Sequence, residues 1–257
     1  MRRRSLKKGE NVISNEQEKL NSSPKILILD IETRPALAYI WRAYDENISP
    51  DQILHPGGML SFAAKWVGDP DVVFFSSWTH SHGAMVRAAH ELLSEADAIV
   101  TYNGDKFDIP KLYGEFLLEG LPPPPPQTSI DVLKSVKKMG FLVNRLAFIG
   151  PLLKAGEKMK HEGFELWAKV LEGDTKAQNK MMRYNIKDVL VLEKLYHNIK
   201  PYIHNHPNLS EQASGACGSC GSTKIQKRGQ RRTKYFTVQR LQCQSCGSWF
   251  DGTRRKL

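Results

Sequence analysis

A short apolar run that ends in two acids is the feature that most constrains the fold of this chain. Ile26-Leu-Ile-Leu29 is followed by Asp30-Ile-Glu32-Thr33. The run predicts a buried strand, and the period of two along a strand places Asp30 and Glu32 on one face. Two like charges at the end of a buried strand repel each other and need a compensating cation, for which a divalent metal ion is suited. Strand-end acids also commonly cap a following turn, so the rest of the chain must decide.

The composition is that of a globular protein with unevenly placed charge. The 257 residues are 40% hydrophobic and 25% charged, enough for one ordinary domain and a small module. Residues 21–214 carry a net charge of −2, whereas residues 215–257 carry +9, which favours a polyanionic partner. No apolar run approaches the ~20 residues of a membrane span. The basic N-terminus lacks the apolar segment of a signal peptide, so we expect no membrane partner and a cytoplasmic location.

Predicted strands come first along the chain and predicted helices last. Residues 1–23 are polar and are expected to form a disordered tail. We expect strands near 25–31, 59–67, 71–78, 98–102 and 128–132, helices near 83–95, 109–119 and 174–199, and helical breaks at Gly140, Gly150-Pro151, Gly156 and Gly163. The second and third strands form a hairpin, and residues 122–126, all proline, form an extended connector. This order predicts an α/β domain over residues 24–203, with a mixed sheet and flanking helices.

Two further acidic motifs follow the first. In Asn103-Gly-Asp105-Lys-Phe107-Asp108, a glycine turn leads into a predicted helix, which we expect Asp105 to cap. Tyr184 and Asp188 are four residues apart and therefore share one face of the last helix. Each motif means little alone.

Together the three motifs resemble those of the DEDD exonuclease family. Tyr184 indicates its Tyr-bearing branch, which includes the proofreading domain of family-B DNA polymerases; the histidine position of the other branch is Arg183 here. The resemblance covers about residues 25–200 and implies a ribonuclease H-like fold with a mixed five-stranded sheet. It further implies a 3′-5′ exonuclease acting on DNA, at single-stranded or frayed ends. With no room for a polymerase domain, the chain looks like stand-alone phage exonucleases, which work in host cytoplasm beside a replication or recombination protein.

Four carboxylates are hard ligands suited to two Mg²⁺ or Mn²⁺ ions, which can support phosphodiester hydrolysis. Asp30 is expected to bridge both ions, Glu32 and Asp188 to hold the ion that carries the attacking water, and Asp108 to serve the second. Tyr184 is expected to orient the water.

Other residues near the motifs also have expected roles. Asn103 and Phe107 are expected to hold the loop or to contact a terminal base. The glycine-bounded loop Lys158-Met-Lys-His161-Glu-Gly163 is interpreted as a solvated charged loop rather than a phosphate contact. An RNA-directed nuclease of the same fold and a non-catalytic nucleic-acid-binding module remain alternatives.

The four cysteines form two C-x-x-C-G pairs near the C-terminus, separated by 22 residues: Cys217, Cys220, Cys243 and Cys246. Four thiolates in two tight turns suit one structural Zn²⁺ ion, and a cytosolic chain disfavours two disulfides. Residues 215–257 therefore resemble a zinc ribbon that depends on its metal to fold, joined by a linker over 204–214.

Between the cysteine pairs, apolar and basic residues predict a small hairpin. Its cations are expected to bind the phosphates of a nucleic acid: Lys227, Arg228, Arg231, Arg232 and Lys234. A ribbon that docks a protein is the alternative.

Overall fold

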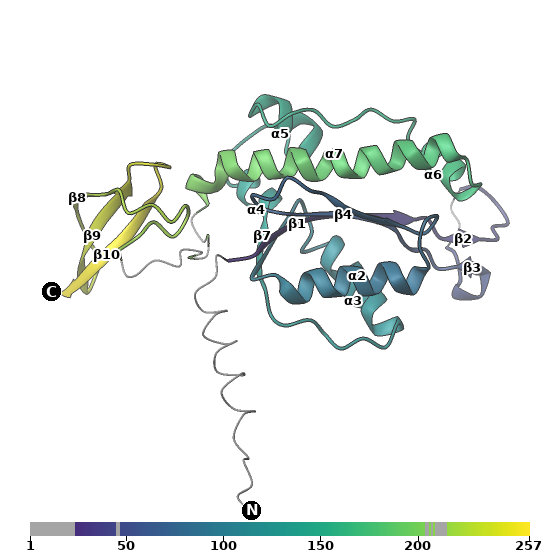
Figure 1. Ribbon diagram of the computed structural model, residues 1–257, viewed down its shortest axis with the longest axis horizontal. Helices are drawn as coiled ribbons and strands as arrows, with labels where there is room; N and C mark the ends of the chain where they lie inside the picture. Colours follow the sequence, from purple (N-terminus) through teal and green to yellow (C-terminus); the bar gives the residue numbers. More distant parts are fainter. Residues whose placement is uncertain (1–23, 45–46, 204–205, 207, 209–214) are drawn as a thin grey trace, which may run out of the picture. The chain divides into compact units, whose positions relative to one another are not determined.

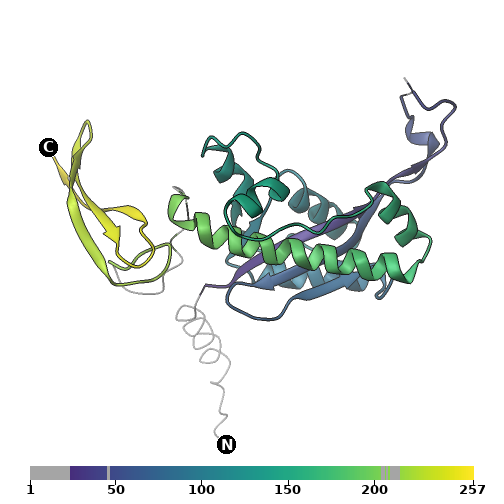
Figure 2. The same ribbon diagram turned by 90° about the horizontal axis from the view of Figure 1, so that it is seen from above.

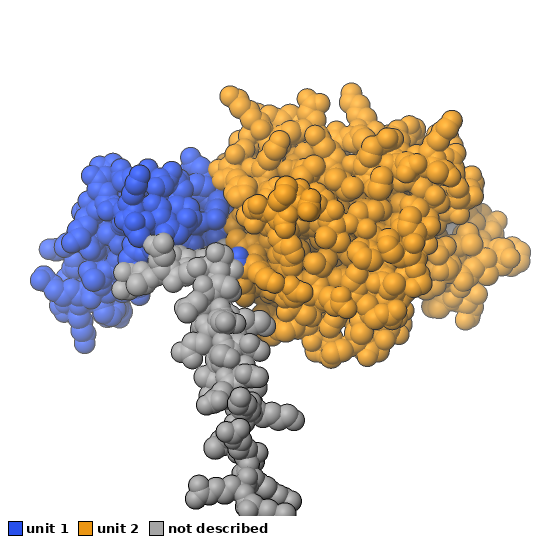
Figure 3. All heavy atoms as spheres, in the orientation of Figure 1, with its two compact units in different colours: residues 1–24, 200–257 blue, residues 25–199 orange. Residues whose placement is uncertain are grey.

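The computed structural model describes residues 24–44, 47–203, 206, 208 and 215–257. The chain divides into two compact units, a larger one over Lys25–Ile199 and a smaller one that contains residues 215–257 (Figure 3). The predicted N-terminal tail and most of the predicted linker lie outside the described residues.

A mixed five-stranded sheet forms the centre of the larger unit (Figure 1). Its strands, in spatial order, are β5 (Val73–Ser76), β4 (Gly58–Trp66), β1 (Ile26–Arg34), β6 (Ala98–Thr101) and β7 (Thr128–Asp131). The β4 strand is antiparallel to β1 and β5, whereas β6 is parallel to β1 and β7. The middle strand β1 is buried on both faces, which explains its continuous apolar run. The predicted fold class is confirmed, as is the hairpin of the second and third predicted strands.

Helices cover both faces of this sheet (Figure 1). On one face, α2 (His82–Glu95) and α3 (Asp108–Leu118) enclose a core that includes Leu29 and Phe62. On the other, α6 (Phe164–Leu171) and the long α7 (Thr175–Ile199) pack with Leu60 of β4. Within the described residues, no helix combines the length and apolar character that crossing a bilayer requires.

Two short helices, α4 (Val132–Lys137) and α5 (Leu146–Leu152), connect β7 to this second layer. The α5 helix includes Pro151, so the break predicted at Gly150-Pro151 is wrong. Pro151 is the residue before the last of α5, so the helix ends at Leu152, directly after the proline.

An arm that the sequence did not reveal joins β1 to β4 (Figure 2). It contains β2 (Leu37–Ala38), the 3₁₀ turn η1 (Pro50–Gln52) and β3 (Ile53–His55), with β2 antiparallel to β3. Its large apolar side chains are exposed rather than buried: Leu37, Tyr39, Ile40, Trp41, Tyr44, Ile48, Ile53 and Leu54. A pattern of burial was therefore not available to identify these short strands.

The smaller unit begins with the 3₁₀ turn η2 (Lys200–Tyr202) and contains a three-stranded antiparallel sheet in the order β10-β9-β8. The predicted hairpin corresponds to β8 (Ile225–Arg232) and β9 (Phe236–Cys243). A third strand, β10 (Trp249–Lys256), was not predicted. Few side chains of this sheet are buried, Val238 being one, so its apolar core is small.

Candidate active site

The β1 strand presents Asp30 and Glu32 on the face of the sheet that α7 covers. Asn185 of α7 donates from Nδ2 to Asp30 Oδ2 at 2.7 Å and to the Asp30 carbonyl at 3.2 Å. One carboxylate oxygen from each of Asp30, Glu32 and Asp188 lies within 4.8 Å of the other two. Asp188 is only 2% exposed. The two outermost sequence motifs therefore meet in one cluster.

Asp108, at the start of α3, lies beside this cluster and is not one of the three acids that lie within 4.8 Å of one another. Its Oδ1 accepts a hydrogen bond from the backbone N–H of Ile31, the residue between Asp30 and Glu32, at 3.0 Å. The turn before α3 restricts two of its residues. Asn103 has a left-handed φ of 72°, and a Cβ on Gly104 would lie 2.3 Å from Thr101. Asparagine is one of the few residues that tolerates a left-handed conformation.

The remaining predictions for this turn have mixed outcomes. The expectation that Asp105 caps α3 is wrong: Asp105 instead binds Ser129 and Lys134, and the N-cap of α3 is Phe107, without a side-chain cap. Asn103 holds the loop through its backbone, since its N–H donates to Asp131 Oδ1 at 2.9 Å. Phe107 is 40% exposed, and contact with a base stays a prediction.

Burial is the largest cause that raises the pKa values of the clustered acids, and their mutual repulsion adds to it. Burial and the nearby Asp188 charge raise the pKa of Glu32 to about 8. Burial, followed by the charges of Glu32, Asp108 and Asp188, raises the pKa of Asp30 well above its usual range. Burial raises the pKa of Asp108 to about 6, although the hydrogen bond from Ile31 opposes it. Without a compensating cation, Glu32 therefore holds its proton at neutral pH.

The donor set fits a divalent metal. Asp188 Oδ1 is buried and, among the described residues, has no hydrogen-bond partner. Hard carboxylate oxygens in a group of this kind are preferred ligands of Mg²⁺ and Mn²⁺. A bound cation would satisfy the orphan oxygen and replace the protons that the raised pKa values imply.

Lys158 is a residue of this site that the sequence interpretation missed. Its Nζ pairs with Asp188 Oδ2 at 2.6 Å and lies 5.1 Å from the centre of the Tyr184 ring. Burial of Asp188 raises the pKa of that carboxyl, and the Lys158 ammonium opposes the rise. The interpretation of Lys158 as part of a solvated loop is therefore wrong, because the lysine is the counter-ion of a buried acid.

The surroundings of Tyr184 include two rings. His161 lies edge-on to Tyr184 with ring centroids 4.9 Å apart, and Trp167 is 6.2 Å away. Burial, followed by the charge of Asp188, raises the pKa of the Tyr184 phenol. Tyr184 is thus a hydrogen-bonding group at neutral pH and not a base.

Asn185 of α7 is a second site residue that the sequence interpretation missed, although its position on the helix could have identified it. Asn185 is fully buried, three residues before Asp188, and also binds Ser61 Oγ through its Oδ1 at 3.2 Å. A polar residue at this spacing from a buried acid shares its face of the helix. Lys158 has no such local signal.

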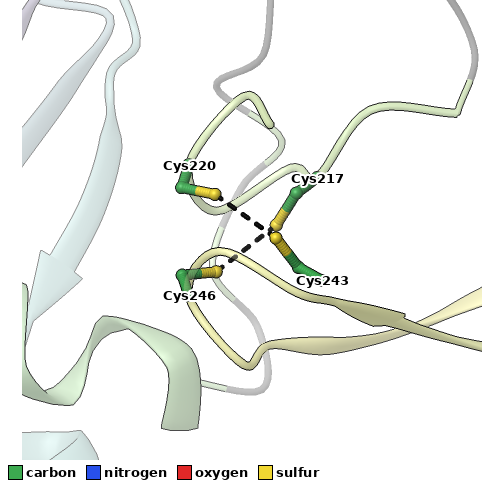
Figure 4. A group of neighbouring side chains, drawn as sticks. All are labelled: Cys217, Cys220, Cys243 and Cys246. Carbon is green, nitrogen blue, oxygen red and sulfur yellow. Dashed lines mark hydrogen bonds between the residues drawn. The ribbon is translucent and has the colours of Figure 1, made fainter. Parts of the chain in front are cut away.

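The smaller unit brings the four cysteines together (Figure 4). Cys217 Sγ lies 3.7 Å from Cys246 Sγ, and Cys220 Sγ lies 3.6 Å from Cys243 Sγ, so neither pair is a disulfide. Four sulfur atoms at Zn–S distances of about 2.3 Å stand about 3.8 Å apart in a tetrahedron, so the cluster has the dimensions of a zinc site. Although burial opposes ionisation, backbone N–H groups of Cys246 and Ser245 lower the pKa of Cys243 to about 6. The cluster could hold zinc.

The basic side chains of the ribbon are exposed, as expected of a contact surface. Arg231 pairs with Asp251 at 2.7 Å, and Lys234 lies over the Tyr235 ring. Arg240, which the sequence interpretation omitted, stacks on Trp249 with its Cζ 4.8 Å from the ring centre. Arg231 is therefore already neutralised in part.

Comparison with known proteins places this chain in a family. The RNase H superfamily matches residues 58–200, more than half of the chain, and the protein belongs to that superfamily. The matched region contains Asp108, Tyr184 and Asp188, whereas Asp30 and Glu32 precede it. No curated protein matches the sequence.

Among solved structures, the family B DNA polymerase from the hyperthermophilic archaeon Pyrobaculum calidifontis is similar, with a TM-score of 0.53 and 16% identity. The similarity covers 83% of this chain and 32% of the polymerase, so it concerns about a third of that enzyme and the fold alone. Fold and superfamily support a nuclease that uses divalent metals and acts on nucleic acid.

Proposed function

We propose that the protein is a two-metal-dependent 3′-5′ exonuclease that hydrolyses phosphodiester bonds of DNA, at single-stranded or frayed 3′ ends. The observation that carries this proposal is the convergence of Asp30, Glu32 and Asp188 within 4.8 Å. Asp108, bonded to the β1 backbone beside them, completes a set of four acids. The resemblance of the three motifs to the Tyr-bearing DEDD branch supports the direction and the DNA substrate.

The four acids would hold two Mg²⁺ or Mn²⁺ ions, which supply an activated water and stabilise the leaving oxygen. Asp188 and Asp30 are held in position by other side chains, Lys158 for the former and Asn185 for the latter. Tyr184, protonated at neutral pH, orients the attacking water through its hydroxyl. Lys158 places a positive charge where negative charge develops on the phosphoryl group.

The basic ribbon would hold the substrate strand. Its cations are carried mainly by β8. Tyr235, in the turn between β8 and β9, and Trp249, at the start of β10, expose their rings. Phosphate contacts and ring stacking are the two interactions that bind single strands without sequence preference. The ribbon would hold one Zn²⁺ as a structural ion.

The test is a degradation assay with purified protein. Single-stranded DNA, duplex DNA and RNA, each labelled at the 5′ or the 3′ end, are incubated with Mg²⁺, Mn²⁺ or EDTA. We expect 5′-labelled DNA to shorten in single-nucleotide steps and 3′-labelled DNA to release its label at once, both only with metal. Degradation of RNA alone would support the ribonuclease alternative. Substrates that stay intact in every lane would support the non-catalytic nucleic-acid-binding module.

A further inference from the structure

A cavity of about 600 Å³ lies at the foot of the β2–β3 arm, and none of the proposed catalytic residues lines it. It is bounded by Arg34 at the end of β1, the segment His55–Met59 and one face of α3 that includes Lys111 and Glu115. Its volume is within the range of pockets that bind nucleotide-sized ligands. The cavity belongs entirely to the larger unit.

The charged groups of the cavity favour an anion. Both oxygens of its buried acid are occupied: Glu115 Oε1 accepts the N–H of Met59 at 2.6 Å, and Oε2 bonds His82 Nε2 at 2.9 Å. Arg34 Nε is buried and, among the described residues, has no hydrogen-bond partner. An unpartnered buried guanidinium nitrogen is costly unless a ligand satisfies it.

Lys111 is the second cation of this cavity. Lys111 is exposed, and no ion pair within the described part of the chain involves it. It stands in the first turn of α3, where the helix dipole disfavours a positive charge. An anion bound between Lys111 and Arg34 would offset both unfavourable placements.

The shape of the wall depends on two glycines. Gly57 and Gly58 have φ of 91° and 132°, and a Cβ on Gly58 would lie 3.1 Å from Glu115 Oε1. The Gly57 N–H donates to His55 Nδ1 at 3.1 Å, so the proton of the neutral His55 ring is on Nε2, which remains a donor. The cavity therefore offers donors of three kinds, namely guanidinium, ammonium and imidazole.

The elements that carry the acids also carry these cations. Arg34 is two residues beyond Glu32 on β1, about 7 Å along the strand, and Lys111 follows Asp108 by three residues on α3. The ladder of β1 shifts register between Glu32 and Thr33. The extra residue at this shift is Leu60 of β4, because Glu32 pairs with Ser61 and Thr33 with Met59. Just beyond the shift, Arg34 lines the cavity together with Lys111 of α3.

We infer that this cavity is a phosphate-binding site, which takes a phosphate of the substrate strand next to the one that is cleaved; the source of the phosphate rests on the proposed function. Arg34 and Lys111 bind the phosphate oxygens. The site fixes the strand without reading its bases.

The binding test uses NMR amide signals of Gly57, Gly58 and Gly114, which line the cavity. The full-length zinc-bound protein, without Mg²⁺ or Mn²⁺, is titrated with inorganic phosphate, thymidine 5′-monophosphate and a tetrathymidylate. We expect these signals to move, and Lys111→Gln to weaken the tetrathymidylate binding seen at these glycines about tenfold, as loss of a charge-assisted hydrogen bond does. Lys194→Gln, an exposed lysine on α7 outside the cavity, should change nothing. Arg34→Lys, which keeps the charge, should retain more binding than Arg34→Gln.

A second readout separates this inference from the proposed function. Lys111→Gln should reduce kcat/KM on an oligonucleotide about tenfold, mainly through KM, whereas Lys194→Gln outside the cavity should leave it unchanged. Glycine signals that never move, or that move as much in Lys111→Gln and Arg34→Gln as in the unaltered protein, overturn the inference even if the enzyme is active. Movement with the monophosphate but not the tetranucleotide overturns the strand as the source. Movement in a protein that cleaves nothing supports the phosphate site and contradicts the nuclease.

Discussion

Replacing Glu32 with Gln should make the stability of the metal-free protein less dependent on pH. The pKa of Glu32 is raised to about 8 in the folded protein, against 4.5 as its ordinary value. Between these values the unfolded chain has lost the proton and the folded protein has kept it. The bound proton of Glu32 therefore stabilises the folded protein fully below about pH 4.5, and this stabilisation is lost as pH rises through about 8.

A carboxyl that keeps its proton only in the folded protein lowers the free energy of unfolding by about 1.4 kcal/mol for each pH unit of rise inside this window. From pH 5.5 to 7.5, Glu32 alone should lower the stability of the metal-free protein by roughly 3 kcal/mol. Glu32→Gln removes this contribution, because its amide does not titrate. Mg²⁺ or Mn²⁺ should also reduce the slope, because the ion takes the place of the protons.

The assay is urea unfolding of the larger unit, followed by tryptophan fluorescence at three pH values. The buffer is free of Mg²⁺ and Mn²⁺ and contains one equivalent of Zn²⁺ for the ribbon. Glu91→Gln is the matched control, since Glu91 is an exposed acid of α2 outside the cluster. An identical pH slope for wild type, Glu32→Gln and Glu91→Gln would refute the reasoning.

Three other perturbations test separate parts of the site. Tyr184→Phe should lower kcat at least about tenfold without weakening Mn²⁺ binding, because the phenol orients water and is not a ligand; weaker Mn²⁺ binding in a titration would contradict that role. Lys158→Gln should lower kcat on single-stranded DNA but not Mn²⁺ affinity at pH 8, since it removes a cation that competes for Asp188, and the exposed Lys160→Gln in the same loop is the control. The triple variant Lys227→Gln, Arg228→Gln, Arg232→Gln should reduce the slope of log K against log salt by about 2 in a single-strand binding assay. Arg231→Gln, whose charge is paired with Asp251, should change it less, and equal slopes in all variants would remove the ribbon from the interface.

The sequence predicted the parts of this protein that depend on local pattern. The short apolar run before Asp30 predicted a buried strand, and alternation along it placed Asp30 and Glu32 together. The four-residue spacing did the same for Tyr184 and Asp188. The C-x-x-C-G pairs bring their own turns, since Gly221 and Gly247 follow the second cysteine of each pair with φ of 74° and 80°.

What the sequence missed depends on contacts between distant residues. Lys158 approaches Asp188 across 30 positions of the chain, and no local spacing predicts that pair. The β2–β3 arm exposes its apolar residues, so a pattern of burial could not identify it. The β10 strand is mostly exposed and ends in three basic residues, so no apolar alternation marks it, and it is held by pairing with β9.

A two-metal centre formed by four acids is the central feature of the proposed nuclease. Crystals of the full-length protein soaked in Mn²⁺ and measured by anomalous scattering test it directly. We predict two peaks about 3.5–4 Å apart, one contacted by Glu32 and Asp188, one by Asp108, and both by Asp30. Crystals that take up Mn²⁺ elsewhere, or not at all, while Lys158 remains paired with Asp188 would contradict the claim.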